Sequence, residues 1–442
     1  MKKLLVANRG EIAVRIIRAA RERGIGTVAV HSSADAEGLA VHLADEAVEI
    51  GPPSAAKSYL AIDNVMEAAK ATGADAIHPG YGFLAENAAF ARRVADEGLI
   101  FVGPDADTIS RMGDKVAARE AAKAAGVPTV PGSDGLVADL EAGKAVADEV
   151  GYPVIIKAAA GGGGRGIRVA EDRAAFERLF SQASAEAKAA FGDGGLYVEK
   201  VVHPARHVEV QILGDGSSAI HLFERECSLQ RRRQKVWEEA PSAVLDTAVR
   251  DKLCASAVRL AEAVNYKGAG TLEYLYDEAS GAFYFIEMNT RIQVEHPVTE
   301  MMTGVDLVGE MLAIASGTPL RFAQEDITQN GHAIEVRINA EDPANSFMPS
   351  PGKVAALRVP GGPGVRWDSM LYQGYEIPPF YDSLLGKLVV WGEDRAHALD
   401  RLAGALKELH VDGLKTTVPL FTALLKVPEV RRGEAHITWL EE

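Results

Sequence analysis

Cysteine is scarce in this sequence: Cys227 and Cys254 are the only two in 442 residues. A disulfide framework is therefore not expected, because such frameworks need several paired cysteines. Long apolar runs are missing too, and none approaches the roughly 20 residues of a membrane-spanning helix. The first residues, MKKLLVANRGEIA, have a short apolar run that Asn8 and Arg9 interrupt, which predicts a β-strand and not a signal peptide. These absences favour a cytoplasmic location, or a comparable reducing compartment after import.

Net positive charge is also lacking. The chain has 47 lysines and arginines against 62 aspartates and glutamates, a net charge of −15. This balance argues against general binding to nucleic acid or to an anionic membrane surface. The apolar content of 47 % and the charged content of 25 % are those of an ordinary soluble globular protein. At 442 residues the chain is too long for one compact core, so we expect two or three domains.

Two common nucleotide-binding fingerprints are absent. The turn after the first predicted strand reads ANRGE and lacks the G-x-G-x-x-G of dinucleotide-binding folds. The run Gly161–Gly164, with Gly166 after it, has no G-K-[ST] ending and is not a P-loop. Its amides can still approach a phosphate, because no side chains keep the backbone away. A flexible turn is the alternative, and the nearby charges of Lys157 and Arg165 leave the two interpretations about equal.

Strands and helices alternate from the start of the chain, which predicts an α/β unit with a parallel sheet. Its expected elements are strands at 3–7, 27–30, 74–77 and 99–102 and helices at 11–23, 63–72 and 86–97. Residues 131–203 read as a small α+β unit bounded by turns rich in glycine and proline. The remainder is α+β, with strands at 207–213, 219–224, 270–276, 333–338 and 385–391, a further strand within 284–295, and helices at 246–264 and 395–409.

The stretch 284–295, YFIEMNTRIQVE, is the most informative part of the sequence. Every second residue of its later part is polar: Glu287, Asn289, Arg291, Gln293 and Glu295. The residues between them are largely apolar, which is the pattern of a strand with two different faces. Because an apolar run leads into the stretch, we expect the polar row to line a cleft; a solvated strand face is the alternative.

A preceding strand at 270–276 is followed by DEASGA, a turn-like segment, and this predicts an antiparallel hairpin closing over residues 278–282. One register of that hairpin places Glu273 opposite Glu287, although the neighbouring register separates them. Opposed like charges destabilise a sheet, and a magnesium ion would reverse the sign of that interaction. Asn289 lies one step further along the same face and could add an oxygen ligand.

Basic residues gather at 225–235, RECSLQRRRQK, which we expect to form a loop. In an acidic chain such a cluster needs an anion, either a phosphate or the adjacent Glu238 and Glu239. Isolated charged residues elsewhere carry little information on their own. The residues alone assign no role to Lys115, Lys200, His207 and Arg337.

The motifs together resemble biotin carboxylase, the ATP-grasp component of biotin-dependent carboxylases. The segments that carry the resemblance are ANRGEIAVRIIRAA, HPGYGFLAEN, MGDK, YPVIIKA with its glycine run, RHVEVQ, QKVWEEAP and FIEMNTRIQVEHPVTE. The likeness runs from about residue 3 to 440 in one order. It implies an ATP-grasp fold with an N-terminal α/β domain (1–113), an ATP-grasp region (114–330) that includes a mobile lid (131–203), and a C-terminal α+β domain (331–442).

The resemblance also implies site residues. The matched nucleotide-binding positions are Lys115, Lys157, Gly163, Gly164, Glu199, Lys200, Val202, His207, Gln230, Arg233, Glu273, Leu275 and Glu287. The matched ligands of two magnesium or manganese ions are Glu273, Glu287 and Asn289. Bicarbonate would be held by Lys235, Arg291, Gln293 and the backbone of Val294, with Glu295 as general base. Because Val294 would present its backbone to the substrate, the resemblance implies that the second half of 284–295 leaves the strand as a loop. Arg337 would face the ureido oxygen of biotin, and Tyr81 would lie near biotin.

Two positions depart from the family pattern: Ala160 stands where a fifth glycine is common, and Arg233 stands where many members have histidine. Neither removes a residue of the catalytic set. No Met-Lys pair follows residue 2, so the Met-Lys-Met biotin-attachment signature of the family is missing. The resemblance therefore implies that biotin is carried on a separate carrier protein, with separate carboxyltransferase subunits, and that the chain is a homodimer.

The expected function is ATP- and bicarbonate-dependent carboxylation of biotin through carboxyphosphate, as a half-reaction of acetyl-CoA carboxylase in fatty acid synthesis. A component of a pyruvate carboxylase or of another acyl-CoA carboxylase is an alternative. A second alternative is another ATP-grasp ligase, which joins an acyl phosphate to an amine. A third, a nucleotide-binding regulatory module without turnover, is disfavoured because the metal carboxylates, the base and both arginines are all present.

Overall fold

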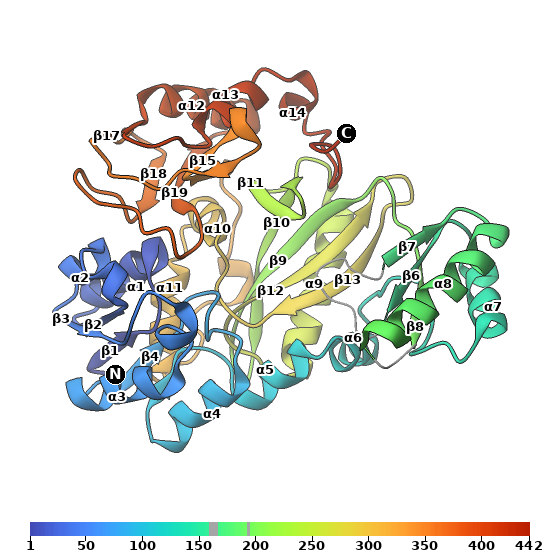
Figure 1. Cartoon of the computed structure of the whole chain (residues 1–442), viewed down its shortest axis with the longest axis horizontal. Helices are drawn as coiled ribbons and strands as arrows, with labels where there is room; N and C mark the ends of the chain where they lie inside the picture. The colour runs from blue at the N-terminus through green and yellow to red at the C-terminus, as the bar shows by residue number, and fades with distance from the viewer. Residues whose placement is uncertain (159–166, 192–194) are drawn as a thin grey trace.

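The computed structural model describes residues 1–158, 167–191 and 195–442. The N-terminal part is a parallel five-stranded sheet in the order β3-β2-β1-β4-β5, with helices around it (blue in Figure 1). The strands are β1 (Lys3–Val6), β2 (Gly26–His31), β3 (Glu46–Glu49), β4 (Ala76–His78) and β5 (Ile100–Phe101). The helices are α1 (Gly10–Glu22), α2 (Leu39–Leu43), α3 (Ile62–Thr72) and α4 (Ala88–Asp96). The predicted α/β parallel unit is confirmed.

Helix α1 connects this unit to the rest of the molecule. Its apolar residues recur at helical spacing, and Ile12, Ile16 and Ala20 are all buried. They belong to one core that also contains Leu213 and Leu312 from the middle of the chain. The N-terminal sheet and the central sheet are therefore packed against a shared core, which holds the N-terminal domain against the site described below.

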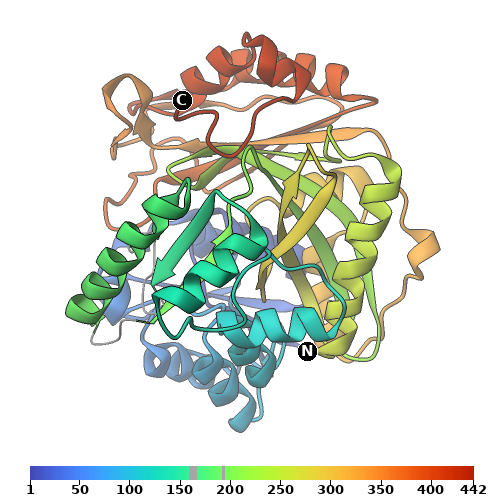
Figure 2. The ribbon, with the colours of Figure 1, turned by 90° about the vertical axis from the view of Figure 1, so that its right-hand side faces the viewer.

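A smaller unit projects on the other side of the molecule (green in Figures 1 and 2). It contains a sheet in the order β7-β6-β8, with two helices packed on it. The elements are α7 (Leu140–Val150), β6 (Val154–Ala158), β7 (Ile167–Ala170), α8 (Arg173–Phe191) and β8 (Leu196–Lys200). The unit has a hydrophobic cluster of its own, which includes Ile156, Phe176 and Val198. It corresponds to the segment expected to form a lid.

The central sheet has eight strands in the order β13-β12-β9-β10-β11-β14-β19-β18. They are β9 (Arg206–Asp215), β10 (Ala219–Arg231), β11 (Gln234–Ala240), β12 (Lys267–Asp277), β13 (Ala282–Asn289), β14 (His332–Asn339), β18 (Val365–Ser369) and β19 (Leu384–Gly392). Helices α9 (Thr247–Ala263), α10 (His296–Thr303) and α11 (Leu307–Ala315) pack against it. All neighbouring strands of this sheet are antiparallel.

The other described elements connect and cover these sheets. The helices are α5 (Ala106–Gly113), α6 (Lys115–Ala124), α12 (Arg395–Glu408), α13 (Val418–Leu424) and α14 (Pro428–Arg432). The short strands are β15 (Glu341–Asp342), β16 (Met348–Pro349), β17 (Ala356–Arg358) and β20 (His410–Asp412). Four 3-10 turns lie at Ser33–Asp35, Ala55–Lys57, Gln324–Asp326 and Pro343–Asn345. None of the helices in the described part of the chain is long and apolar enough to cross a membrane.

The expected basic loop at 225–235 is wrong. Residues up to Arg231 continue β10, and β11 begins at Gln234, so only a tight turn separates the two strands. The density of charged residues led to the prediction of a loop, because the residues that pair with these charges are distant in the sequence. Arg225 donates to Glu209 Oε1 at 2.6 Å and is fully buried. Glu238 and Glu239, the expected alternative partners of the basic cluster, pair instead with Arg337 and Arg395.

Candidate active site

A row of charged side chains crosses one face of the central sheet. Glu287, Glu273 and Glu209 stand opposite one another on β13, β12 and β9, and Arg225 on β10 is opposite Glu209. Directly opposed residues share a face of the sheet. The predicted register of Glu273 with Glu287 is confirmed. Adjacent carboxylates repel one another, so this row requires cations in contact with it.

Lys235 on β11 supplies one of these cations. Its ammonium group donates to Glu209 Oε2 at 2.6 Å, to Glu295 Oε1 at 2.7 Å and to Glu273 Oε1 at 2.9 Å. Burial opposes the charged form, but the carboxylates outweigh it and hold the pKa of Lys235 well above its ordinary value. An ammonium has three N–H donors, so all of them are engaged. Lys235 is therefore the charge around which the acidic side chains are arranged.

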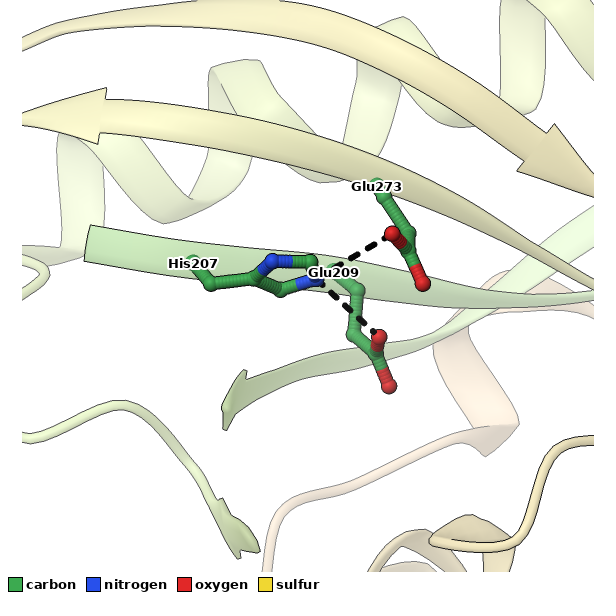
Figure 3. Close-up of side chains that lie close together, drawn as sticks. All are labelled: His207, Glu209 and Glu273. Atoms are coloured by element: carbon green, nitrogen blue, oxygen red, sulfur yellow. Dashed lines mark ion pairs between the residues drawn. The ribbon is translucent and has the colours of Figure 1, made fainter. Parts of the chain in front are cut away.

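His207 is a second cation beside the row (Figure 3). Its Nε2 lies 3.3 Å from Glu273 Oε2 and 3.7 Å from Glu209 Oε2. Burial is the largest single effect and lowers the pKa of His207, but Glu273 and Glu209 together outweigh it and raise the pKa to about 9. The imidazole is thus charged at neutral pH. Ligand atoms of these three residues lie within 4.8 Å of one another, and His207 could share a metal ion with the two carboxylates only after losing its proton.

The residues predicted to bind metal are brought together at the end of the hairpin. Burial and the charge of Glu273 raise the pKa of Glu287, while Lys115 lowers it. The amide of Asn289 donates to Glu273 Oε1 at 3.1 Å. Two carboxylates and an amide oxygen are the donor set that magnesium prefers. A divalent cation would remove the repulsion that raises the pKa of Glu287, so the chemistry of these residues fits such an ion.

Glu295 lies immediately before α10 and is only 2 % exposed. Lys235 contacts one of its oxygens, and Arg337 Nη2 donates to the other at 3.0 Å. Burial raises the pKa of Glu295, but the charges of Lys235 and Arg337 outweigh burial and lower it below its ordinary value. Arg337 is fixed in turn by Glu238, whose Oε1 accepts from its Nε at 2.6 Å. Glu295 is thus an ionised carboxylate, held at both oxygens, that can accept a proton.

The loop 290–295 follows β13, which ends at Asn289, so the second half of the stretch leaves the strand as the resemblance implied. Gln293 is buried and contacts two residues of the row, Glu273 at 3.0 Å and Arg225 at 2.9 Å. The backbone carbonyl of Val294 accepts a hydrogen bond from Lys387 at 2.7 Å. The predicted bicarbonate residues therefore lie together in one loop beside Lys235.

Arg291 in this loop faces the N-terminal domain. Its Nε donates to Glu86 Oε2 at 2.8 Å, and its Nη2 donates to Asn289 Oδ1 at 3.1 Å. The backbone N–H of Thr290 also donates to Glu86, at 3.2 Å. Glu86 therefore connects the HPGYGFLAEN segment to the loop, and sequence reasoning did not predict this contact.

The predicted nucleotide residues come from several elements. Lys115 begins α6, and Lys157 and Glu199 lie on the small sheet, where they form an ion pair. Arg119 donates to the other oxygen of Glu199 at 2.7 Å. Gly163 and Gly164, like Ala160, lie outside the described residues. The remaining positions are Lys200 at the end of β8, Val202 just after it, the buried Gln230 on β10, the exposed Arg233 in the following turn, and Leu275, which pairs with His207.

Several residues of the site were missed. Glu209 carries a signal that sequence reasoning could have used: it follows His207 by two residues on one strand and therefore lies on the same face. Tyr81 was predicted, but its partner was not: its hydroxyl donates to Glu11 of α1. The residues that sequence reasoning did not place in the site are Glu11, Glu86, Glu209, Arg225, Glu238 and Lys387.

The chain matches three family models that together cover nearly all of it. They are the biotin carboxylase N-terminal domain at residues 1–109, the ATP-binding domain of the carbamoyl-phosphate synthase L chain at 114–323, and the biotin carboxylase C-terminal domain at 335–442.

Full-length relatives agree with these matches. The chain is 56 % identical to biotin carboxylase of Pseudomonas aeruginosa over 444 residues, covering 100 % of this chain and 98 % of the relative. It is 51 % identical to a pyruvate carboxylase subunit of Methanothermobacter thermautotrophicus, covering 100 % of this chain and 89 % of the relative.

A solved structure shows the same fold. It is the biotin carboxylase domain dimer of 2-oxoglutarate carboxylase from Hydrogenobacter thermophilus, in complex with MgADP, ADP and bicarbonate. The TM-score is 0.90 at 49 % identity, with 100 % of this chain and 97 % of that chain covered. The predicted ATP-grasp fold is confirmed, and the chain belongs to the biotin carboxylase family of ATP-dependent ligases.

Proposed function

We propose that this chain uses ATP and bicarbonate to carboxylate biotin on a separate carrier protein, with carboxyphosphate as the intermediate. The observation that carries the proposal is Glu295, an ionised and buried carboxylate between Lys235 and Arg337. Bicarbonate is a weak nucleophile until it loses its proton, so the site needs a base that stays ionised and a cation beside it. Glu295 and Lys235 meet these two requirements.

The proposed reaction uses the residues of the loop in order. Glu295 takes the proton of bicarbonate, while Lys235, Arg291, Gln293 and the backbone of Val294 hold the anion. A bicarbonate oxygen then attacks the γ-phosphorus of ATP, and ADP leaves. Carboxyphosphate breaks down to carbon dioxide and phosphate, and the phosphate removes the ureido N–H proton of biotin. Arg337 stabilises the resulting enolate oxygen, and the deprotonated ureido nitrogen attacks the carbon dioxide to form carboxybiotin. Tyr81 lies beside the biotin ring in this proposal.

The predicted nucleotide residues surround the phosphates and the base in this proposal. Lys115 and Lys157 neutralise phosphate charge, and Lys200 and Val202 present backbone groups to adenine. Glu199 is ion-paired with Lys157 and Arg119, and we propose that ATP takes over the partnership with Lys157 when it binds. The other proposed nucleotide contacts are Gly163, Gly164, His207, Gln230, Arg233, Glu273, Leu275 and Glu287.

Glu273, Glu287 and Asn289 are the proposed ligands of two magnesium or manganese ions. When bound, these ions neutralise the charge that develops on the transferred phosphoryl group. The solved relative bound to MgADP and bicarbonate supports this assignment.

We further propose that the carboxyl group passes to acetyl-CoA, for fatty acid synthesis, with carboxyltransferase proteins as partners and the chain as a cytoplasmic homodimer. The dimeric solved relative supports the proposed homodimer, and the acceptor is the one that the family resemblance implied. Pyruvate is the alternative acceptor, because a relative from a pyruvate carboxylase is 51 % identical over the whole chain. The proposed division is 1–113, 114–330 with a mobile lid at 131–203, and 331–442.

Purification of the native complex tests the acceptor and the partners. Mass spectrometry of proteins that co-purify with the tagged chain is expected to identify a biotinylated carrier and a carboxyltransferase specific for acetyl-CoA. A carboxyltransferase for pyruvate would contradict the proposed acceptor and leave the carboxylation of biotin unaffected.

A further inference from the structure

A buried lysine lies directly behind the bicarbonate loop. Lys387 on β19 has no exposed surface. Its ammonium donates to the carbonyl oxygen of Val294 at 2.7 Å and lies 3.1 Å from Glu11 Oε1. A buried ammonium is costly unless it is paired and hydrogen-bonded, so these two contacts define where Lys387 can sit.

The contact to Val294 orients the catalytic base. The peptide bond between Val294 and Glu295 is planar, and in the trans form its C=O and N–H point in opposite directions. Because Lys387 holds the carbonyl on its own side, the N–H of Glu295 must point away from Lys387. One hydrogen bond therefore sets the plane of the peptide from which the Glu295 side chain leaves.

The contact to Glu11 extends this arrangement to the N-terminal domain. Glu11 lies in the first turn of α1, is 3 % exposed, and accepts a hydrogen bond from the Tyr81 hydroxyl with the same Oε1 that faces Lys387. Helix α1 packs against β19, as the neighbouring ribbons in Figure 1 show. Tyr81, Glu11, Lys387 and Val294 thus form one continuous chain of polar contacts.

Other charged groups face Lys387 without replacing these contacts. On the same sheet, Arg337 and Asp368 stand opposite it, and Glu335 lies two residues from Arg337. His296 of α10 is fully buried next to the loop, and its Nδ1 lies 2.7 Å from the carbonyl oxygen of Gln293. Among the described residues, Glu11 is the carboxylate that forms an ion pair with Lys387.

We propose that Glu11 and Lys387 are positioning residues. They fix the position and orientation of the general base, Glu295, relative to Tyr81, so that bicarbonate and biotin bind in the geometry that the reaction needs. This inference rests on the proposed roles of Glu295 and Tyr81. Neither residue of the pair touches a substrate, because both are buried behind the residues that do. A misplacement of about 1 Å at such a point costs on the order of 10²-fold in rate.

Steady-state kinetics with free biotin tests the proposal. Lys387→Met is expected to raise the KM for bicarbonate and lower kcat at least tenfold, with the KM for ATP changed less than twofold. Glu11→Gln is expected to raise the KM for both bicarbonate and biotin, and Tyr81→Phe only the KM for biotin. Lys407→Met, at an exposed lysine of α12, is the matched control and should behave as the wild type.

A double variant separates positioning from stability. Glu11→Leu with Lys387→Met replaces the buried pair by apolar side chains, which folded proteins often tolerate. It is expected to melt closer to the wild-type temperature than Lys387→Met alone, which leaves Glu11 buried without its cation, and still to show the raised KM for bicarbonate. Wild-type kinetics in this variant, or additive effects of Glu11→Gln and Tyr81→Phe in a double-mutant cycle, would overturn the proposal. Wild-type enzyme without biotin-dependent phosphate release would instead overturn the proposed function.

Discussion

Glu238 and Glu335 are two buried carboxyl groups that stand opposite each other on β11 and β14. Glu238 Oε2 and both oxygens of Glu335 have no hydrogen-bond partner among the described residues. Burial raises the pKa of Glu238 to about 7 and raises the pKa of Glu335 well above its ordinary value. Glu238 is held by Arg337, so Glu335 is the member of the pair that retains its proton.

Replacement of Glu335 by glutamine is therefore expected to change the pH dependence of stability. Between the unfolded pKa of about 4.3 and the raised folded pKa, the folded protein binds more protons than the unfolded chain, so stability falls as pH rises. Glutamine mimics the neutral acid and removes this dependence. Glu335→Gln should gain melting temperature relative to the wild type at pH 8 and gain little at pH 5.

The control is Glu408→Gln, at an exposed glutamate of α12, which should follow the wild type at both pH values. A Glu335→Gln variant that loses stability at pH 8 would show that the carboxyl group is ionised in the folded protein.

At the scale of elements, the turn between β10 and β11 has an unusual backbone. Arg232 and Arg233 both have positive φ angles, 49° and 64°. Tight hairpin turns with two left-handed residues favour Asn-Gly, because side chains with a Cβ are strained there. Such a conformation costs about 1–2 kcal/mol per residue. Strain of this kind at two arginines indicates that the side chains are kept for a function.

The double substitution Arg232→Asn and Arg233→Gly should relieve this strain. The free energy of unfolding in urea is expected to rise by about 1–2 kcal/mol. The KM for ATP is expected to rise as well, because Arg233 is a proposed nucleotide contact. The single variants assign each effect to its residue, and a stabilised enzyme with an unchanged KM for ATP would show that Arg233 does not contact the nucleotide.

Local sequence patterns predicted the elements whose partners are close in sequence. The hairpin was predicted from its turn-like segment, and the pairing of Glu273 with Glu287 was one of its two possible registers. The strand Arg225–Arg231 was taken for a loop, because its charges are neutralised from afar: Gln293, 68 residues away, is one partner of Arg225.

The predicted site residues were found by resemblance to a family, and the supporting contacts were not. For example, Arg291 donates a hydrogen bond to Glu86, which is 205 residues away in the sequence. The spacing of apolar and polar residues along the sequence does not predict such a contact, because the contact depends on how the N-terminal domain packs against the central sheet. Lys387 and Glu11 were missed for the same reason, since they come from opposite ends of the chain.

At the scale of the whole molecule, the proposed metal site on the acidic row predicts that ATP cleavage depends on a divalent cation. Removal of metal with EDTA is expected to abolish ATP cleavage, and addition of magnesium or manganese in excess should restore it. Thermal melting provides a second readout: MgATP should raise the melting temperature, because a ligand that binds only the folded state stabilises it. A Glu287→Gln variant should lose most of this shift, whereas full activity in EDTA would contradict the metal assignment.

The most direct test of the account is transfer of labelled bicarbonate to biotin. Purified wild-type protein with ATP, magnesium, free biotin and ¹⁴C-bicarbonate is expected to form labelled carboxybiotin, with one phosphate released for each biotin carboxylated. Glu295→Gln should reduce both products by about 10²–10⁴-fold, the usual contribution of a general base, while its MgATP-induced melting shift stays that of the wild type. Labelled carboxybiotin at the wild-type rate in Glu295→Gln would contradict the role of Glu295, and no labelled carboxybiotin from the wild type would contradict the proposed function itself.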